Sequence, residues 1–292
     1  MPDLALPLTQ SEAFERTCSK LGLTTMRVSN RYGSCLIQTR QLPLLGAFHL
    51  ISRGPVLADP AALRPFLRQV RCERKGLLVV NAPADALRTG GFKLARGAEL
   101  AIADLIEPSE MRARLHQKWR NQLKKAEASH LMVTDQPLEA SRHKWFLDAE
   151  AAQQLSQRYK SYPSPFLLAY AAANKGQARL YTASLNSRPV AAMLVLKHGS
   201  MATYQAGVTT PEGRAHCAHN LILWQIMCDL QKRRVQRLDL GRADLSPGLR
   251  RFKLGSGAAI ETLAGSFLFH HWFAPRTEPS SHPDTIAPRP GS

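Results

Sequence analysis

The chain has 292 residues, of which 44% are hydrophobic, and its formal net charge is +17. An apolar fraction of this size supplies a buried core, so the composition excludes a largely disordered or collagen-like protein. No apolar run reaches the roughly 18 residues of a membrane-spanning helix, and the first residues lack the pattern of a secretory signal. The positive charge favours a polyanionic partner, such as nucleic acid, nucleotide phosphates or an anionic membrane surface.

The five cysteines are odd in number, scattered and without a C-x-x-C pair, which disfavours both a disulfide scaffold and a zinc site. Thiols in this arrangement are typical of a reducing compartment, so we expect a cytoplasmic protein. His216 and His219 are spaced as ligands could be, but no second pair accompanies them, and we expect no metal.

Helices and strands are expected to alternate in the first third of the chain. Short β-type runs follow a helix, and Arg53-Gly54-Pro55 marks a turn. A helix with a basic outer face then leads into a buried strand. The expected elements are a helix at 11–21, strands at 24–29, 34–39 and 47–52, a helix at 59–74, and strands at 77–81 and 98–104.

Residues 109–129 give the strongest helical pattern, with Ser109 as the expected N-cap. Its apolar positions form one stripe, Met111, Leu115, Trp119, Leu123 and Ala126. The other faces are basic, which is typical either of a solvated linker helix or of a surface that binds an anion. The candidate residues for an anionic partner are Lys118, Arg120, Lys124 and Lys125.

The same order of elements is expected a second time, which predicts an α/β fold with mixed sheets and two similar domains. The expected elements are helices at 144–158 and 165–174, strands at 178–184, 189–196 and 201–207, a helix at 218–234, and strands at 235–240 and 261–267. Five prolines in residues 275–292 predict a disordered tail. The expected core includes Leu77, Val79, Leu194, Leu221, Trp224, Ile226, Leu238 and Leu240.

The candidate catalytic residues are Phe252 and Lys253, which follow the strand that ends at Gly241. In α/β sheets, ligands gather beyond the C-terminal ends of strands. A lysine held there beside an aromatic ring could stabilise negative charge that develops on a carbonyl oxygen. The sequence lacks a G-x-S-x-G elbow, an H-E-x-x-H helix and a Walker A loop, and it identifies no general base.

Six short motifs, in order and reaching to about Phe273, together resemble the Fem family, the peptidyltransferase-like branch of the GNAT superfamily. A turn, a strand and a basic helix come first, and two strands and a helix follow. The matching segments are Arg53-Gly54-Pro55-Val56, residues 102–105 with 118–127, Tyr204-Gln205-Ala206-Gly207, Asn220-Leu221-Ile222-Leu223-Trp224, Asp239-Leu240-Gly241, and residues 251–257.

The resemblance implies two GNAT-like domains, the first spanning 1–135 and completed by 258–274, the second spanning 136–257. It implies that Phe252-Lys253 lies at the acyl-transfer site. The substrate-binding residues that it suggests are Lys20, Arg214, Tyr204 and Arg251, of which Lys20 and Arg214 would contact a phosphate-bearing acceptor.

The function that we expect is transfer of an acyl or aminoacyl group to an amine, in cell-envelope or polysaccharide synthesis. Aminoacyl-tRNA, acyl-carrier protein and acyl-CoA all remain open as donors, and no covalently bound cofactor is expected. The Q/R-x-x-G-x-G/A loop that holds the acyl-CoA pyrophosphate in ordinary GNAT enzymes has no counterpart in residues 208–216, which contain one glycine. The alternative is a non-catalytic basic module that binds nucleic acid or anionic lipid head groups at a membrane surface.

Overall fold

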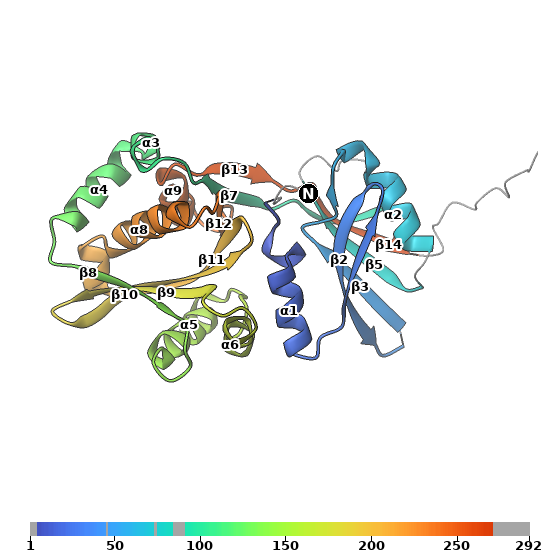
Figure 1. Ribbon diagram of the computed structural model, residues 1–292, viewed down its shortest axis with the longest axis horizontal. Coiled ribbons are helices and arrows are strands. Elements are labelled where there is room, and N and C mark those ends of the chain that lie inside the picture. The colour runs from blue at the N-terminus through green and yellow to red at the C-terminus, as the bar shows by residue number, and fades with distance from the viewer. Residues whose placement is uncertain (1–4, 45, 73–74, 84–90, 271–292) are drawn as a thin grey trace, which may run out of the picture.

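The computed structural model describes residues 5–44, 46–72, 75–83 and 91–270, and these form two mixed sheets joined by a shared core (Figure 1). The first sheet has the strand order β1-β2-β3-β5-β14-β6, with β4 paired to β2. The second has the order β13-β7-β12-β11-β10-β9-β8. The expected disordered tail lies outside the described residues.

The first half contains one helix on each side of its sheet, α1 and α2 (Figure 1). Ser11 caps α1, because its side chain accepts a hydrogen bond from the Phe14 amide. The elements are η1 Leu8–Gln10, α1 Glu12–Lys20, β1 Thr25–Asn30, β2 Gly33–Leu42, β3 Gly46–Ser52, β4 Val56–Leu57, η2 Pro60–Ala62, α2 Leu63–Cys72, β5 Leu77–Ala82, β6 Phe92–Arg96 and, from the end of the chain, β14 Gly265–His270.

The second half packs α5 and α6 on one side of its sheet and α4 and α8 on the other (Figure 1). Its elements are β7 Glu99–Asp104, α3 Pro108–Arg114, α4 Gln117–Glu127, β8 Met132–Pro137, α5 Lys144–Gln157, α6 Ser164–Ala173, β9 Ala178–Leu185, β10 Arg188–His198, β11 Met201–Thr209, α7 Pro211–Ala215, α8 Ala218–Lys232, β12 Arg237–Arg242, α9 Pro247–Gly255 and β13 Ala259–Thr262.

Each half repeats the predicted order of helix, three strands, helix and strand. In both halves the three strands pair antiparallel. The strand after the crossing helix then pairs parallel to the third, β5 with β3 and β12 with β11. A parallel neighbour requires such a crossover connection, and α2 and α8 provide it. The predicted α/β class and the doubled architecture are confirmed.

The last two described strands, β13 and β14, lie in different sheets. This corrects the single strand expected at 261–267. β13 pairs with β7 in the second sheet, and the chain then crosses so that β14 enters the first sheet between β5 and β6. Strand pairing thus puts β7 and β13 in the second sheet, whereas the expected ranges 1–135 and 258–274 assign both to the first domain.

The single helix expected at 109–129 is in fact two helices. Leu115 and His116 have extended backbone angles, and the His116 amide donates to the Gly255 carbonyl oxygen of α9 instead of continuing the helix. The first of the two helices begins at Pro108 with Glu107 as its N-cap, so Ser109 does not have the expected capping role. The predicted apolar stripe is nevertheless buried at every position.

Two expected core positions in β5 are wrong by one residue. Leu78 and Val80 are buried among the residues that α2 covers, whereas Leu77 and Val79 are only half-buried on the opposite face. A continuous apolar run does not reveal which alternate residues face the core, because neighbouring side chains point to opposite sides. Trp224, also expected in the core, is partly buried and packs against its edge.

This register predicts different losses of stability for two neighbouring leucines. Leu78→Ala removes a fully packed side chain and should lower the free energy of unfolding by about 2–5 kcal/mol, whereas Leu77→Ala should cost clearly less. Urea unfolding of the two variants measures the difference. Equal losses, or a larger loss for Leu77→Ala, would contradict the assigned register.

The two halves share a core in which α1 of the first half packs against α6 of the second (Figure 1). Phe14 and Cys18 of α1 lie in one apolar cluster with Phe166 and Tyr170 of α6. The Asn174 amide after α6 donates to the Ala13 carbonyl oxygen at 3.0 Å. The junction between the halves is therefore a packed interface.

Candidate active site

The candidate site lies where the parallel strands β11 and β12 separate. They pair over three positions, and the last pair is Thr203 with Asp239. Beyond it, β11 continues to Thr209 and β12 continues to Arg242. The two diverging segments, 204–209 and 240–242, are called here the β11–β12 fork. Strand ends of this kind are the usual ligand-binding edge of an α/β sheet.

β11 is irregular where it leaves β12. Its pairing with β10 passes from Tyr204 opposite Val195 to Ala206 opposite Leu194, so that Gln205 is an extra residue in β11. A bulge of this type leaves the extra residue outside the regular ladder and re-aims nearby side chains, and it is common next to active sites.

Lys253 reaches the β12 side of the fork from α9. Its side chain is buried, with 6% of the residue exposed, and its Nζ donates to the Arg242 carbonyl oxygen at 2.6 Å. Burial lowers the pKa of Lys253 to about 8, while the carboxylates of Asp239 and Asp244 act in the opposite direction. A partly desolvated ammonium is thus held at the end of β12.

The position of Lys253 depends on the packing of α9. Ser246 caps the helix through the Leu249 amide. Phe252 is half-buried, and its ring lies 6.2 Å from that of Trp119 and 6.4 Å from that of His219. Phe252 therefore anchors the helix that presents Lys253 and has no polar group of its own to offer a substrate.

Gly241 is the last residue of the Asp-x-Gly motif, and its φ of +75° explains why glycine is needed. Its amide donates to Asp239 Oδ1 at 2.7 Å. A Cβ atom at this position would lie 3.8 Å from Lys253 Nζ. The turn at Gly241 consequently brings β12 close to the lysine.

The first half contributes Arg53 to the same place. Its guanidinium pairs with Asp239, a carboxylate that is only 1% exposed. Arg53 has a φ of +55°, an unusual conformation for a residue with a side chain, and its buried Nε has no hydrogen-bond partner within the described part of the chain. Gln10 fixes the turn by donating to the Ser52 carbonyl oxygen at 2.8 Å. This ion pair links the two halves beside Lys253.

His198 lies next to this ion pair but is not suited to accept and release protons near neutral pH. It is 2% exposed, and its Nε2 is 2.9 Å from the Thr203 hydroxyl. Its pKa is lowered to about 4, chiefly because the ring is buried; the Asp239 carboxylate opposes this shift, and the Arg53 guanidinium adds to it. The ring is therefore a neutral imidazole.

The structure brings some predicted residues together and separates others. Tyr204 is the first residue of β11 beyond the last pair with β12, so it belongs to the diverging segment 204–209. Arg251 is exposed on α9. Arg214 is exposed on α7 and donates to the Thr209 carbonyl oxygen at 3.2 Å. Lys20 is exposed in the last turn of α1, a helix of the other half.

The basic helix α4 presents Lys118, Lys124 and Lys125 to solvent. Arg120 differs, because its guanidinium donates to the carbonyl oxygens of Ala113 and Leu115 at 3.1 and 2.9 Å. Arg120 therefore secures the break between α3 and α4, and its assignment to the anion-binding set stays a prediction.

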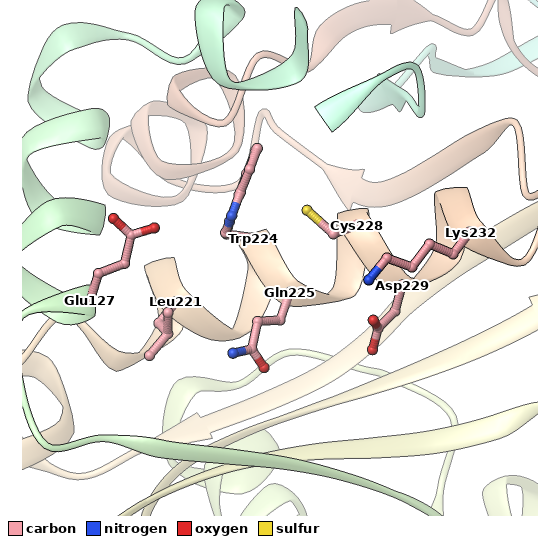
Figure 2. Close-up of a pocket in the computed structure, with 7 residues that line it drawn as sticks. All are labelled: Glu127, Leu221, Trp224, Gln225, Cys228, Asp229 and Lys232. Atoms are coloured by element: carbon pink, nitrogen blue, oxygen red, sulfur yellow. The ribbon is translucent and has the colours of Figure 1, made fainter. Parts of the chain in front are cut away.

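A pocket of about 410 Å³ lies between α4 and α8, on the outer surface of the second half (Figure 2). Arg112 forms two hydrogen bonds to Glu127 at its edge, at 2.8 and 2.7 Å, and lies over the Trp224 ring. The pocket is lined by Glu127, Leu221, Trp224, Gln225, Cys228, Asp229 and Lys232. None of the residues predicted to bind substrate lines it.

Two further properties bear on the site. Within the described ranges, no three His, Cys, Asp or Glu residues are grouped so that they could hold a metal ion. No helix among the described residues is long and apolar enough to cross a membrane.

Comparisons with solved structures show what this fold resembles. FemX is similar with a TM-score of 0.73 and 14% identity, over 91% of this chain and 93% of that chain. The C-terminal domain of a putative lysylphosphatidylglycerol synthetase from Agrobacterium fabrum has a TM-score of 0.57 and 14% identity, over 89% of this chain and 87% of that one. L-PGS from Bacillus licheniformis has a TM-score of 0.52 and 15% identity, over 90% and 92%.

These identities are low, so the structural likeness concerns the fold. A comparison with curated protein sequences found no significant match. The profile of the acetyltransferase (GNAT) domain family, however, matches residues 109–254, half of the chain, including the fork and Lys253. The chain therefore belongs to the acetyltransferase (GNAT) domain family, and it is an acyltransferase whose fold resembles that of FemX.

Proposed function

We propose that this acyltransferase moves an acyl or aminoacyl group from an activated ester or thioester to an amine, with the reaction centre at the β11–β12 fork. The amine attacks the donor carbonyl carbon, and negative charge develops on the carbonyl oxygen. The observation that carries the proposal is the buried Lys253 ammonium at the end of β12. A charged donor held in place in a partly dry site stabilises such an oxyanion without reorganisation.

The loop before α8 argues against acyl-CoA as the preferred donor. Three backbone amides of this loop already have partners within or next to the short helix α7. The Gly213 amide donates to the Thr210 hydroxyl at 3.0 Å, and the amides of His216 and Cys217 donate to carbonyl oxygens of Glu212 and Arg214. An open set of amides is what a phosphate needs at a helix N-terminus.

The exposed lysines of α4 support a polyanionic donor, either aminoacyl-tRNA or an acidic acyl-carrier protein. One structural neighbour is named for lysylphosphatidylglycerol, a product that carries a lysyl group, which fits aminoacyl transfer. We place the reaction in the cytoplasm, in cell-envelope or polysaccharide synthesis, with an amine as acceptor. Contact with a membrane surface fits the same basic charge.

A donor panel tests the proposal. Mass spectrometry of ligands retained on the purified protein would first identify bound donors or acceptors. Acyl-CoA, acyl-carrier protein and aminoacyl-tRNA would then be offered with a mixture of amines. Transfer from tRNA or carrier protein is expected, and transfer from acyl-CoA alone would overturn the donor preference. Binding of tRNA or lipid without transfer from any donor would favour the non-catalytic module.

The basic helix gives a prediction of its own. Lys124→Met should weaken binding of total tRNA. The logarithm of the binding constant should also fall less steeply with the logarithm of the salt concentration, by about 1 in slope, because one phosphate contact is removed. Fluorescence anisotropy over a range of salt concentrations measures both effects. Lys175→Met is the matched control, since Lys175 is also exposed but lies after α6. Identical salt slopes for the two variants would contradict a binding role for α4.

A further inference from the structure

A buried carboxylate in α5 is not explained by the chemistry assigned so far. Glu150 is 3% exposed, and both of its oxygens accept from the Tyr159 hydroxyl, at 2.9 and 3.0 Å. The Gln154 amide donates to Oε1 at 3.3 Å. Among the residues that the structure describes, no lysine, arginine or histidine forms an ion pair with Glu150. A buried carboxylate without a cation is costly and needs a reason.

Hydrogen bonds attach this pair to the β11 side of the fork. The Gln153 amide bridges the Tyr159 hydroxyl, at 3.0 Å, and the Gly207 carbonyl oxygen, at 3.1 Å. Two residues earlier in the strand, the Gln205 amide donates to the Ser161 hydroxyl at 2.8 Å. Both β11 residues belong to the diverging segment 204–209. The Glu150–Tyr159 pair and the loop after α5 therefore lie along one wall of the fork, and Lys253 lies at the other.

Tyr204 connects the pair to the start of the fork. Its hydroxyl approaches Gly207 so closely that a Cβ atom there would overlap with it, which accounts for glycine at this position. Burial raises the pKa of Tyr204, and the nearby Glu150 and Tyr159 raise it further. Tyr159 is half-buried, so the residue that bonds to Glu150 is less enclosed than Glu150 itself.

We infer that Glu150 and Tyr159 together accept the proton of the acceptor amine, Tyr159 as the group that touches the amine and Glu150 as the positioning residue that takes the proton from Tyr159. The inference rests on the proposed function, for which the sequence offered no base. It assigns the two walls of the fork opposite tasks: the β12 wall stabilises negative charge on the carbonyl oxygen, and the β11 wall removes positive charge from the nitrogen.

The amine lone pair forms the C–N bond, and the carbonyl π electrons move to the oxygen near Lys253. The nitrogen passes a proton to the Tyr159 oxygen as the Tyr159 hydroxyl proton passes to the Glu150 carboxylate. The intermediate then collapses, the bond from carbon to the leaving sulfur or oxygen breaks, and the leaving group takes the proton back through Tyr159. Both side chains end as they began.

Burial also raises the pKa of Glu150, which Tyr159 and Gln154 oppose by hydrogen bonding. A base whose pKa lies nearer the working pH is a better proton acceptor. Burial raises the pKa of Tyr159 to about 12, so Tyr159 passes the proton on and does not hold it. Turnover should therefore rise with pH through the titration of Glu150.

The test compares Glu150→Gln, Tyr159→Phe and Asp148→Asn in pH–kcat profiles, with the donor and amine on which the wild-type protein is active. Asp148 is the matched control, because it is an exposed carboxylate on the same helix, paired with Lys144. Glu150→Gln and Tyr159→Phe should lower kcat by about 10²–10⁴-fold with little change in KM. Glu150→Gln should also lose the acidic limb of the profile, whereas Asp148→Asn should retain it.

The outcomes separate the two proposals. A wild-type protein that transfers no acyl group from any donor overturns the proposed function, and this inference with it. An active wild-type protein whose Glu150→Gln variant keeps the acidic limb overturns the inference alone. A purely structural role would lower kcat equally at every pH and would leave the limb in place. Tyr159→Phe supplies the same comparison if Glu150→Gln does not fold.

Discussion

Replacing Lys253 by methionine is expected to lower turnover by about 10²–10³-fold while most of the substrate affinity remains. Loss of one oxyanion donor typically has this effect, equivalent to about 2.7–4 kcal/mol of transition-state stabilisation. Methionine keeps the length and apolar stem of the side chain, so α9 should still pack through Phe252 on Trp119. Steady-state kinetics of the variant, with the donor found in the panel, gives kcat and KM separately.

The pH dependence of the wild-type protein follows from the same residue. The pKa of Lys253 is lowered to about 8, so the ammonium is present below this pH and is lost as the pH rises through it. If the ammonium stabilises the oxyanion, turnover should fall above about pH 8. Lys253→Met should lack this alkaline limb, because no group remains there to titrate.

Lys124→Met provides the comparison, since it removes the same charge from the exposed face of α4. It should act on binding of the anionic partner, and its effect should diminish as salt increases. The catalytic assignment of Lys253 would be wrong if both variants lost the same modest fraction of activity and high salt removed the difference from wild type. The non-catalytic module would then be favoured.

The parts of the fold that could be predicted from the sequence are those fixed by local pattern. The order of helices and strands, the crossing helices and the buried stripe through Trp119 follow from periodicity within short windows. The misplaced parts depend on distant partners. The break at His116 exists because its amide bonds to Gly255, and the split of the last strand exists because β7 and β5 belong to different sheets. Neither partner is visible in a local window.

The candidate site also contains residues that a local pattern reveals and residues that depend on distant partners. Lys253 and Phe252 could be predicted because they follow a strand end and match a family motif. Asp239 was visible in the Asp-x-Gly motif, but its partner Arg53 is 186 residues away in the chain. Glu150 lies in α5, a helix of weak periodicity, and Tyr159 lies in the loop after it. The hydrogen bonds through Gln153 that connect this pair to β11 form only after the sheet has folded. In the sequence, only a run of polar residues near a predicted helix end could have drawn attention to Glu150 and Tyr159.

Replacing Arg53 by methionine is expected to lower the free energy of unfolding by about 3–5 kcal/mol. The substitution leaves Asp239, 1% exposed, as a buried charge without its cation, and removing one member of a buried pair has a cost of this order. Urea unfolding measures the loss. Lys144→Met, which breaks the exposed pair with Asp148, is the control and should cost less than about 1 kcal/mol.

A double-mutant cycle distinguishes the ion pair from the packing of Arg53. Asp239→Asn keeps an oxygen that can accept from the Gly241 amide, so the double variant should recover a large part of the stability lost in Arg53→Met. Additive losses would show that the charge of Asp239 is not what Arg53 neutralises.

Asp239 of this ion pair should also affect the pH dependence of turnover. The Asp239 carboxylate raises the pKa of Lys253 against the larger effect of burial, so Asp239→Asn should lower that pKa further below about 8. The alkaline limb of the pH–kcat profile should then move to lower pH, whereas Lys144→Met should leave it in place. A limb that stays unchanged in Asp239→Asn would mean that the limb does not report Lys253. A shifted limb would show that the Asp239 carboxylate, the partner of Arg53, helps to set the charge state of Lys253.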